Sequence, residues 1–484
     1  MNRLGLFVLF LAAFPAQAAR LELQPCRLPE IEGEALRCGT WEVFENRAAG
    51  KGRKIPLRVV VIPARETPVE PDPVVYFEGG PGVSIVQSGP DVVEELAAVL
   101  RHRDILLVDV RGTGGSHRLD CPPPDGGQAV EQTLDTFMDP AALRRCRETL
   151  AKENDLSQYT TDSIVDDVDE VRAALGYPKV NVMGASYGTR AALVYLRRHP
   201  ESVRTVMLSS VLPVDARVPL SLAPQTQAGF DRMAADCAAE PACHAAFPDP
   251  KADLDAVLKR LEAGPAEVAV EGGEGDQGKP QKLRLSRNGA AQTVRYLLYR
   301  PSGVRVLPLF LRRAAAGDLG PLGQASWDIA SAMRSASAQG LYLSVTCAED
   351  VAFVDRAEAE RLARGTFFGD FRLRQQLDAC AGWPAAKVPA SFLEPVRSSA
   401  PVLILAGEND PTTPVEWARR VSETLPGSRL LVVPGGNHVF HNLEGIGCID
   451  RLTAELVERG SAAGLDLEGC RRSIRRPPFA TSLE

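Results

Sequence analysis

The sequence lacks any apolar run long enough to cross a membrane, which takes about twenty residues, since even the run at Leu4–Phe14 has only eleven. It has ten cysteines, but none of them stand in the C-x-x-C spacing of zinc sites. It also lacks an excess of positive charge, since the formal net charge is −7. No internal repeat is present. These absences argue against an integral membrane protein, a zinc-bound fold, a nucleic-acid-binding protein and a repeat architecture.

The first residues have the pattern of an export signal. Arg3 precedes an apolar run at Leu4–Phe14, and the small-residue sequence PAQAA follows at residues 15–19. We therefore predict a signal peptide over residues 1–18, and a protein that is periplasmic or secreted. No cysteine follows the apolar run directly, so we expect no lipid anchor there.

The cysteines agree with export, because an even number without metal-site spacing is typical of disulfides in an oxidising compartment. Chain neighbours are the simplest pairs among the many that the count allows. They are Cys26/Cys38, Cys121/Cys146, Cys237/Cys243, Cys347/Cys380 and Cys448/Cys470.

The most informative motif is GASYG at residues 184–188, which lies between a short apolar strand and a helical pattern. A serine on a very sharp strand-to-helix turn needs glycines two residues to either side, because side chains there would clash with the backbone. The helix N-terminus then directs N–H groups at the serine oxygen, where negative charge develops. The motif predicts Ser186 as a nucleophile.

Apolar runs alternate with helical patterns through much of the chain. We predict an N-terminal hairpin with its turn at Gly50–Lys54, and a helix at 162–175 whose acidic residues form a solvated face. The predicted buried strands are 73–77, 104–110, 180–183, 203–209, 341–345, 401–405 and 429–433. From Pro213 to Gly340 the alternation stops and the sequence is mainly helical, apart from a turn or short hairpin at 262–282.

This organisation predicts an α/β-hydrolase fold, with a mostly parallel central sheet, helices on both faces and an inserted, mainly helical cap. We expect the first part of the core at 19–213, the cap at 214–340 and the C-terminal part of the core at 341–484.

An acid and a histidine follow the last two strands. Asp410 comes after the strand at 401–405, and His438 stands 28 residues later, after the strand at 429–433. Serine, acid and histidine in this order are typical of α/β-hydrolases. His438 would take the Ser186 proton, and Asp410 would orient the imidazole and offset its charge. Glu408 is an alternative to Asp410, and His441 is an alternative to His438.

A glycine-rich loop, EGGPG at residues 78–82, follows the early strand at 73–77. The fold needs an oxyanion donor from such a loop. Proline has no N–H, so Gly80 is the best candidate.

Several motifs, all in family order, resemble the proline iminopeptidase and tripeptidyl aminopeptidase group of α/β-hydrolases. They are EGGPG at 78–82, DVRGTGGS at 109–116, GASYGTRAAL at 184–193, GENDPTTP at 407–414 and GGNH at 435–438. CGTWEVFENR near the N-terminus and TCAED at 346–350 are closer to the secreted tripeptidyl aminopeptidase branch. The resemblance is weakest across Val214–Gly340. It implies a serine exopeptidase with Ser186, Asp410 and His438 as its triad, and with oxyanion donors at Gly80 and Tyr187.

The sequence departs from that group at two places. Glu78 stands where the iminopeptidases carry histidine, and Ser209-Ser210 stands where the relatives tend to have Asp-Gly. Both departures bear on substrate preference more than on the chemistry.

An aminopeptidase needs a carboxylate that recognises the substrate ammonium group. The candidates are Glu78, Glu349 and Asp350, for each of which an ordinary structural role is the alternative.

We expect a peptide substrate with a free N-terminus, no metal or organic cofactor, no nucleic acid and no stable membrane association; the oligomeric state is not predicted. A secreted carboxylesterase-type acyl hydrolase with the same triad is the alternative function, because the fold does not select the substrate. A catalytically silent binding protein is a third hypothesis, which the intact triad and oxyanion elements disfavour.

Overall fold

The structure, a computed structural model, describes residues 20–121, 130, 132–135, 139–272 and 279–483. The predicted signal peptide lies outside the described residues. A nine-stranded sheet forms the centre of the molecule, in the order β1-β2-β3-β5-β4-β6-β7-β10-β11. Its strands are β1 (Gln24–Cys26), β2 (Leu36–Phe44), β3 (Lys54–Ile62), β4 (Val74–Phe77), β5 (Ile105–Val108), β6 (Val180–Ala185), β7 (Val203–Ser209), β10 (Val402–Gly407) and β11 (Ser428–Val433).

The six strands from β5 to β11 in this order pair in parallel, whereas β1, β2 and β3 form an antiparallel extension that includes the predicted N-terminal hairpin. Side chains alternate between the two faces of a strand. On β3, Val59 and Val61 therefore enter one hydrophobic cluster, while Val60 and Ile62 enter another. The sheet is buried on both faces, as a doubly covered parallel sheet requires.

Two groups of helices supply this cover. The first face packs against α3 (Pro140–Glu153), α4 (Thr161–Ala174), α5 (Tyr187–Arg198), α12 (Gln339–Glu349) and α15 (Val415–Glu423). The second face packs against α1 (Gly89–Glu95), α16 (Gly447–Arg459) and α17 (Leu467–Ser473). The predicted α/β-hydrolase architecture is confirmed.

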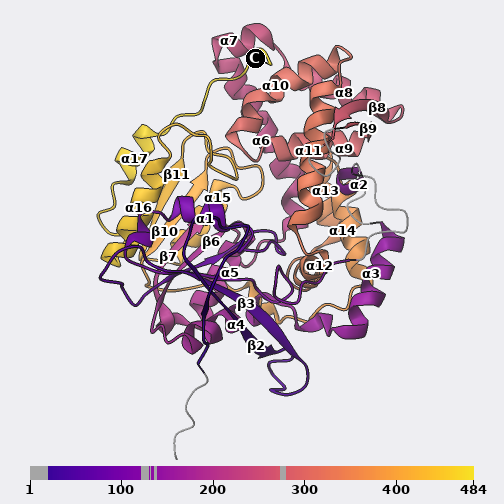
Figure 1. The fold of residues 1–484 in the computed structure, drawn as a ribbon. Coiled ribbons are helices and arrows are strands. Elements are labelled where there is room, and N and C mark those ends of the chain that lie inside the picture. The colour runs from indigo at the N-terminus through magenta and orange to yellow at the C-terminus, as the bar shows by residue number, and fades with distance from the viewer. Residues whose placement is uncertain (1–19, 122–129, 131, 136–138, 273–278, 484) are drawn as a thin grey trace, which may run out of the picture.

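A separate helical layer lies to one side of the sheet (Figure 1) and has its own hydrophobic cluster. It contains α6 (Val218–Ala239), α7 (Pro241–Ala246), α8 (Pro250–Glu262), α9 (Arg287–Leu297), α10 (Pro301–Ala315) and α11 (Gly320–Ala336). The interruption predicted at 262–282 is an antiparallel hairpin of β8 (Ala266–Glu271) and β9 (Pro280–Leu285). Further short helices are α2 (Gln132–Asp135), α13 (Arg356–Ala363) and α14 (Phe371–Ala381), and Phe371 joins the same cluster.

The strand predicted at 341–345 is wrong, because this segment belongs to helix α12. Leu341, Leu343 and Val345 are fully buried in the core cluster, and the polar Ser344 is fully buried beside them. A helix that is buried on nearly all sides has no polar stripe, so its sequence is a continuous apolar run like that of a buried strand. The sheet resumes only at β10.

The solvated acidic face predicted for 162–175 is also wrong at one position. The helix forms as predicted, but Asp167 is fully buried. Its carboxylate binds the buried Arg111 guanidinium at 2.6 Å and the Arg47 guanidinium at 2.7 Å. Both arginines come from distant segments, so the polarity of the helix sequence did not reveal this burial.

All five disulfides join chain neighbours, as predicted. Among the residues that the structure describes, no helix combines the length and the apolar character that a membrane span requires.

Candidate active site

Ser186 stands on a strained turn between β6 and α5. Its φ is 53° and its ψ is −121°, a conformation that is costly for a residue with a side chain. A Cβ on Gly184 would lie 2.3 Å from the Gly188 carbonyl oxygen, and a Cβ on Gly188 would lie 1.9 Å from the Phe77 carbonyl oxygen. Both glycines are therefore required by the close passage of the backbones.

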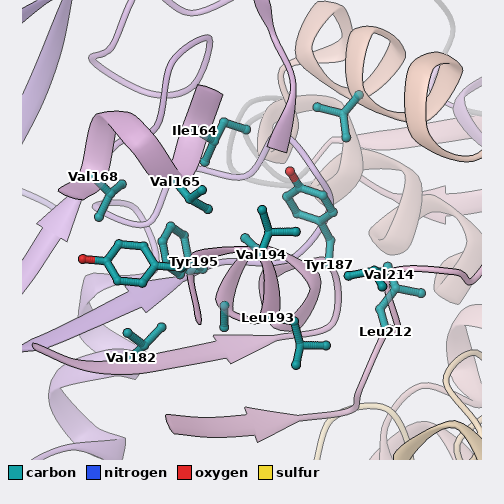
Figure 2. Packing of buried hydrophobic residues seen from close by; sticks show 14 of the residues in the cluster. Ile164, Val165, Val168, Val182, Tyr187, Leu193, Val194, Tyr195, Leu212 and Val214 are labelled. Atoms are coloured by element: carbon teal, nitrogen blue, oxygen red, sulfur yellow. The ribbon is translucent and has the colours of Figure 1, made fainter. Parts of the chain in front are cut away.

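The packing behind this turn holds it in place. Helix α5 is buried from Tyr187 to Leu196, and Figure 2 shows residues of α4 and β6 gathered around Val194 and Tyr195. The Thr189 hydroxyl donates to the Ser186 carbonyl at 2.6 Å. The Ser186 amide donates to the Ser209 carbonyl of β7 at 3.0 Å.

The structure brings Asp410 and His438 together. The Asp410 carboxylate follows β10, His438 follows β11, and His438 Nδ1 lies 2.9 Å from Asp410 Oδ2. The Thr413 hydroxyl donates to the same Oδ2 atom at 2.6 Å, and the amides of Thr412 and Thr413 donate to Oδ1 at 2.7 and 2.9 Å. Burial alone would raise the pKa of Asp410, but His438 and these donors hold it below its ordinary value. Asp410 is thus an ionised acceptor at neutral pH.

The two alternatives have other partners. Glu408 accepts a hydrogen bond from the Gly435 amide at 2.9 Å, which supports the loop that carries the histidine. His441 lies 3.3 Å from the Glu95 carboxylate, and this contact raises its pKa. Of the four residues considered, only Asp410 and His438 contact each other as acid and histidine.

The histidine loop is supported from two sides. Ser210 adopts a left-handed φ of 57°, and its hydroxyl donates to the His438 carbonyl at 2.7 Å. The left-handed conformation accounts for the glycine that the resembling family tends to have here. From the helical layer, Tyr299 places its ring edge-on to the His438 ring at a centroid distance of 4.8 Å, and its carbonyl accepts from the Val439 amide at 2.9 Å.

A cavity of about 1530 Å³ connects these groups. Ser186 and His438 line it, together with Glu78, Gly79 and Gly80 from the loop after β4. The loop passes close to the serine, since a Cβ on Gly79 would lie 3.8 Å from Ser186 Oγ. The carboxyl ends of the parallel strands meet at this edge, which is where ligands bind in such folds.

Of the backbone amides near Ser186, one already has a hydrogen-bond acceptor within the protein and two are candidates to bind an oxyanion. The Gly79 amide donates to Glu78 Oε1 at 2.8 Å, so it is already occupied. Tyr187 is the first residue of α5, and the first four N–H groups of a helix have no partner within the helix. Gly80 lines the cavity with a φ of 111°. Gly80 and Tyr187 thus remain the candidate oxyanion donors.

Of the three acids considered for substrate binding, the structure brings Glu78 alone to the cavity. Glu78 is half-buried there, and burial raises its pKa. Glu349 and Asp350 do not line the cavity. Both are buried at the end of α12, where the Asp350 carboxylate pairs with Arg190 at 2.9 Å.

Glu349 instead supports the serine turn from behind. Its carboxylate accepts from the Thr161 amide at 2.7 Å and from the Thr161 hydroxyl at 2.6 Å. The Tyr187 hydroxyl lies 2.8 Å from the same Thr161 hydroxyl, so a buried chain of hydrogen bonds reaches the residue after Ser186. Burial raises the pKa of Glu349 to about 7.

The family model described as the alpha/beta hydrolase fold matches residues 72–444, which include all of these groups. The chain belongs to the α/β-hydrolase family. Serine protease Hip1 of Mycobacterium tuberculosis is 25% identical over 495 residues, covering 92% of this chain and 90% of that protein. Tripeptidyl aminopeptidase of Streptomyces coelicolor is 25% identical over 500 residues, covering 97% of this chain and 88% of that protein. The solved structure of proline iminopeptidase from Mycobacterium smegmatis aligns with a TM-score of 0.41 and 16% identity, covering 87% of this chain and 98% of that structure.

Several groups around the site of this α/β-hydrolase were not predicted from the sequence. Thr413 had a signal, because a hydroxyl three residues after an acid in a strand-end loop is placed to bind its carboxylate. Arg190 also had a signal in the sequence, because it is a charged residue on an apolar helix face. Tyr299 had no signal in the sequence, because it reaches His438 from the helical layer.

The described residues contain no group of three or more histidine, cysteine or acidic side chains that could hold a metal ion.

Proposed function

We propose that this protein is an exported serine aminopeptidase that cleaves peptide bonds near free N-termini. One observation carries the proposal. A strained serine between two required glycines shares a cavity with a histidine whose Nδ1 lies 2.9 Å from a buried, ionised aspartate. This arrangement has the components of an acyl-transfer site.

The proposed reaction proceeds through an acyl-enzyme. Ser186 Oγ attacks the carbonyl carbon of the substrate while His438 Nε2 takes the serine proton, and Asp410 stabilises the imidazolium through Nδ1. The amides of Tyr187 and Gly80 stabilise the oxyanion. His438 then protonates the leaving amine, and water, activated by the same imidazole, hydrolyses the ester at Ser186.

Relatives named serine protease and tripeptidyl aminopeptidase support a peptide substrate over other acyl compounds. The five disulfides support an oxidising compartment, periplasmic or extracellular. Glu78 is the proposed partner of the substrate ammonium group, since it lines the cavity beside the candidate oxyanion loop. A bound ammonium group would stabilise its carboxylate against the effect of burial.

The nucleophile is tested by Ser186→Ala, which we expect to abolish hydrolysis while the circular dichroism spectrum stays that of the wild type. Thr149→Ala removes another hydroxyl from the cavity wall and serves as the matched control, with activity retained. Turnover by Ser186→Ala at a rate near that of the wild type would refute the mechanism.

Ammonium recognition is tested separately by Glu78→Gln. A hydrogen bond to a charged group contributes about 1.5–3 kcal/mol, so we expect kcat/KM for free-amine peptides to fall about 10- to 100-fold. Asp120→Asn changes a second acid of the cavity wall, one that pairs with Arg118, and should leave kcat/KM unchanged. An equal effect of both variants would refute the role of Glu78.

A further inference from the structure

Arg295 of α9 differs in its partners from most buried arginines of this protein. Five arginines of the described residues are less than a tenth exposed, namely Arg103, Arg111, Arg190, Arg295 and Arg372. The first three each form an ion pair with a buried aspartate, at 3.0, 2.6 and 2.9 Å. A buried charge without such a partner is costly, so arginines are rarely buried unless paired.

The neighbours of Arg295 are phenols. Its guanidinium donates to the Tyr299 hydroxyl, and its central carbon lies 5.0 Å from the ring centroids of both Tyr296 and Tyr299. Arg295 is 6% exposed, and its Nε has no hydrogen-bond partner. Within the described part of the chain, no carboxylate forms an ion pair with it. The site therefore holds a positive charge and a donor that the protein itself does not neutralise.

This charge belongs to the wall of the active-site cavity. Arg295, Tyr296 and Tyr299 all line it, together with Ser186 and His438. Tyr299 contacts both the Arg295 guanidinium and the His438 ring, and the two ring centroids lie 4.8 Å apart. A group bound by Arg295 would thus lie close to the bond that reacts at Ser186.

The other charged side chains of the cavity wall also favour the binding of a negatively charged group. The described residues that line it include six arginines and three acids, so the wall is positive on balance. They are Arg58, Arg118, Arg295, Arg300, Arg334 and Arg372, against Glu78, Asp120 and Asp139. Such a wall attracts anionic groups of a substrate, while Glu78, the proposed partner of the ammonium group, is one of its three acids.

We propose that Arg295 binds a carboxylate of the substrate, next to the bond that is cleaved. The planar guanidinium fork is suited to carboxylate oxygens, and the Tyr299 hydroxyl accepts a hydrogen bond from it. The carboxylate is either the side chain of an acidic residue near the cleaved bond or the C-terminal carboxylate of a short peptide. This inference deepens the proposed aminopeptidase function and rests on it.

The test compares matched substrates that differ only in the carboxylate. Tripeptidyl nitroanilides with glutamate or glutamine at each position in turn report an acidic side chain, because the nitroanilide blocks the C-terminus. Tetrapeptides with a free or amidated C-terminus report the terminal carboxylate. We expect the wild type to prefer the carboxylate member of at least one pair by about 10- to 100-fold in kcat/KM. A ratio near one in every pair would overturn the proposal.

The variants then assign the preference to Arg295. In Arg295→Met the ratio of the two kcat/KM values should fall to about one, whereas Arg284→Gln, which alters an exposed arginine of β9 that does not line the cavity, should keep the wild-type ratio. If Arg295→Met lowers both members of a pair equally, Arg295 only positions Tyr299 and the proposal is refuted. If Arg295→Met does not fold, Arg295→Lys is measured instead. It keeps the charge but loses the fork, so its ratio should be lower than that of the wild type, and an unchanged ratio would refute the proposal.

Failure of the aminopeptidase function would be visible separately. If no free-amine peptide is cleaved but nitrophenyl esters are, the carboxylate preference is measured on the nitrophenyl half-ester of adipic acid against nitrophenyl hexanoate. Preference for the half-ester that Arg295→Met removes would support the carboxylate site on a different reaction. Absence of that preference would overturn it.

Discussion

Ser210 combines a strained backbone with a contact that supports the histidine loop, and two substitutions separate these effects. Ser210→Ala removes the hydroxyl that donates to the His438 carbonyl at 2.7 Å but keeps a side chain at φ 57°. Ser210→Gly removes the same hydroxyl and relieves the strain. Both variants leave the carbonyl in a buried environment, since Ser210 and His438 are both buried.

The magnitudes predict different stabilities for the two variants. Loss of the hydrogen bond with a buried acceptor left unsatisfied destabilises by about 1–3 kcal/mol. A left-handed conformation costs a residue with a Cβ about 1–2 kcal/mol, and glycine avoids this cost. Glycine also loses more backbone entropy on folding, which takes back roughly 0.5–1 kcal/mol of that gain in stability. We therefore expect Ser210→Ala to lose about 1–3 kcal/mol of unfolding free energy, and Ser210→Gly to be about 1 kcal/mol more stable than Ser210→Ala.

Activity should respond differently from stability. Both variants release the same tether on the histidine loop, so kcat/KM should fall by a similar factor in each, about tenfold, because small displacements of reacting groups are costly. Chemical denaturation with the disulfides intact measures the stabilities, and hydrolysis of one substrate by all three proteins measures the activities. A Ser210→Gly variant less stable than Ser210→Ala, or wild-type activity in either variant, would contradict these roles of Ser210.

Three further predictions concern buried groups. Burial raises the pKa of Glu349 from 4.5 to about 7, so the folded state binds one more proton than the unfolded state between these pH values. The unfolding free energy therefore falls as the pH rises through that window, by up to about 3 kcal/mol. Glu349→Gln should flatten this slope in denaturation curves at pH 5 and 7.5; equal slopes would contradict it. Asp167→Asn leaves the buried Arg111 without an ionised partner and should lose about 3–5 kcal/mol of unfolding free energy, and a loss below about 1 kcal/mol would refute the buried pair. Gly188→Ala would place a Cβ 1.9 Å from the Phe77 carbonyl oxygen, so we expect misfolding or a loss of activity of at least about 100-fold; a soluble variant with normal turnover would contradict the tight turn.

The elements that the sequence predicted are those whose cause is local. The serine turn follows from steric requirements of a five-residue motif, and the disulfides follow from short spacings along the chain. Strands β7 and β11 were predicted to within one residue, because each is a short apolar run bounded by polar residues or turns.

The features that it did not predict depend on partners far away in the chain. The buried helix α12 has the composition of a strand, and Asp167 is buried by arginines from distant segments. Tyr299 and Arg295 reach the cavity from the helical layer, and neither belongs to a motif. The predicted role of Glu349 in substrate binding illustrates the same limit, since its position at the C-terminal end of the buried helix α12 decided which groups its carboxylate could reach.

One comparison of substrates distinguishes a serine aminopeptidase from other serine hydrolases. We would measure kcat/KM for a free-amine tripeptidyl nitroanilide and its N-acetylated counterpart, with a short nitrophenyl ester in parallel, using the wild type and Ser186→Ala. We expect acetylation to block turnover of the nitroanilide, and we expect Ser186→Ala to hydrolyse none of the three substrates. Ester turnover that depends on Ser186, without cleavage of the free-amine nitroanilide, would contradict the peptidase assignment and favour an esterase.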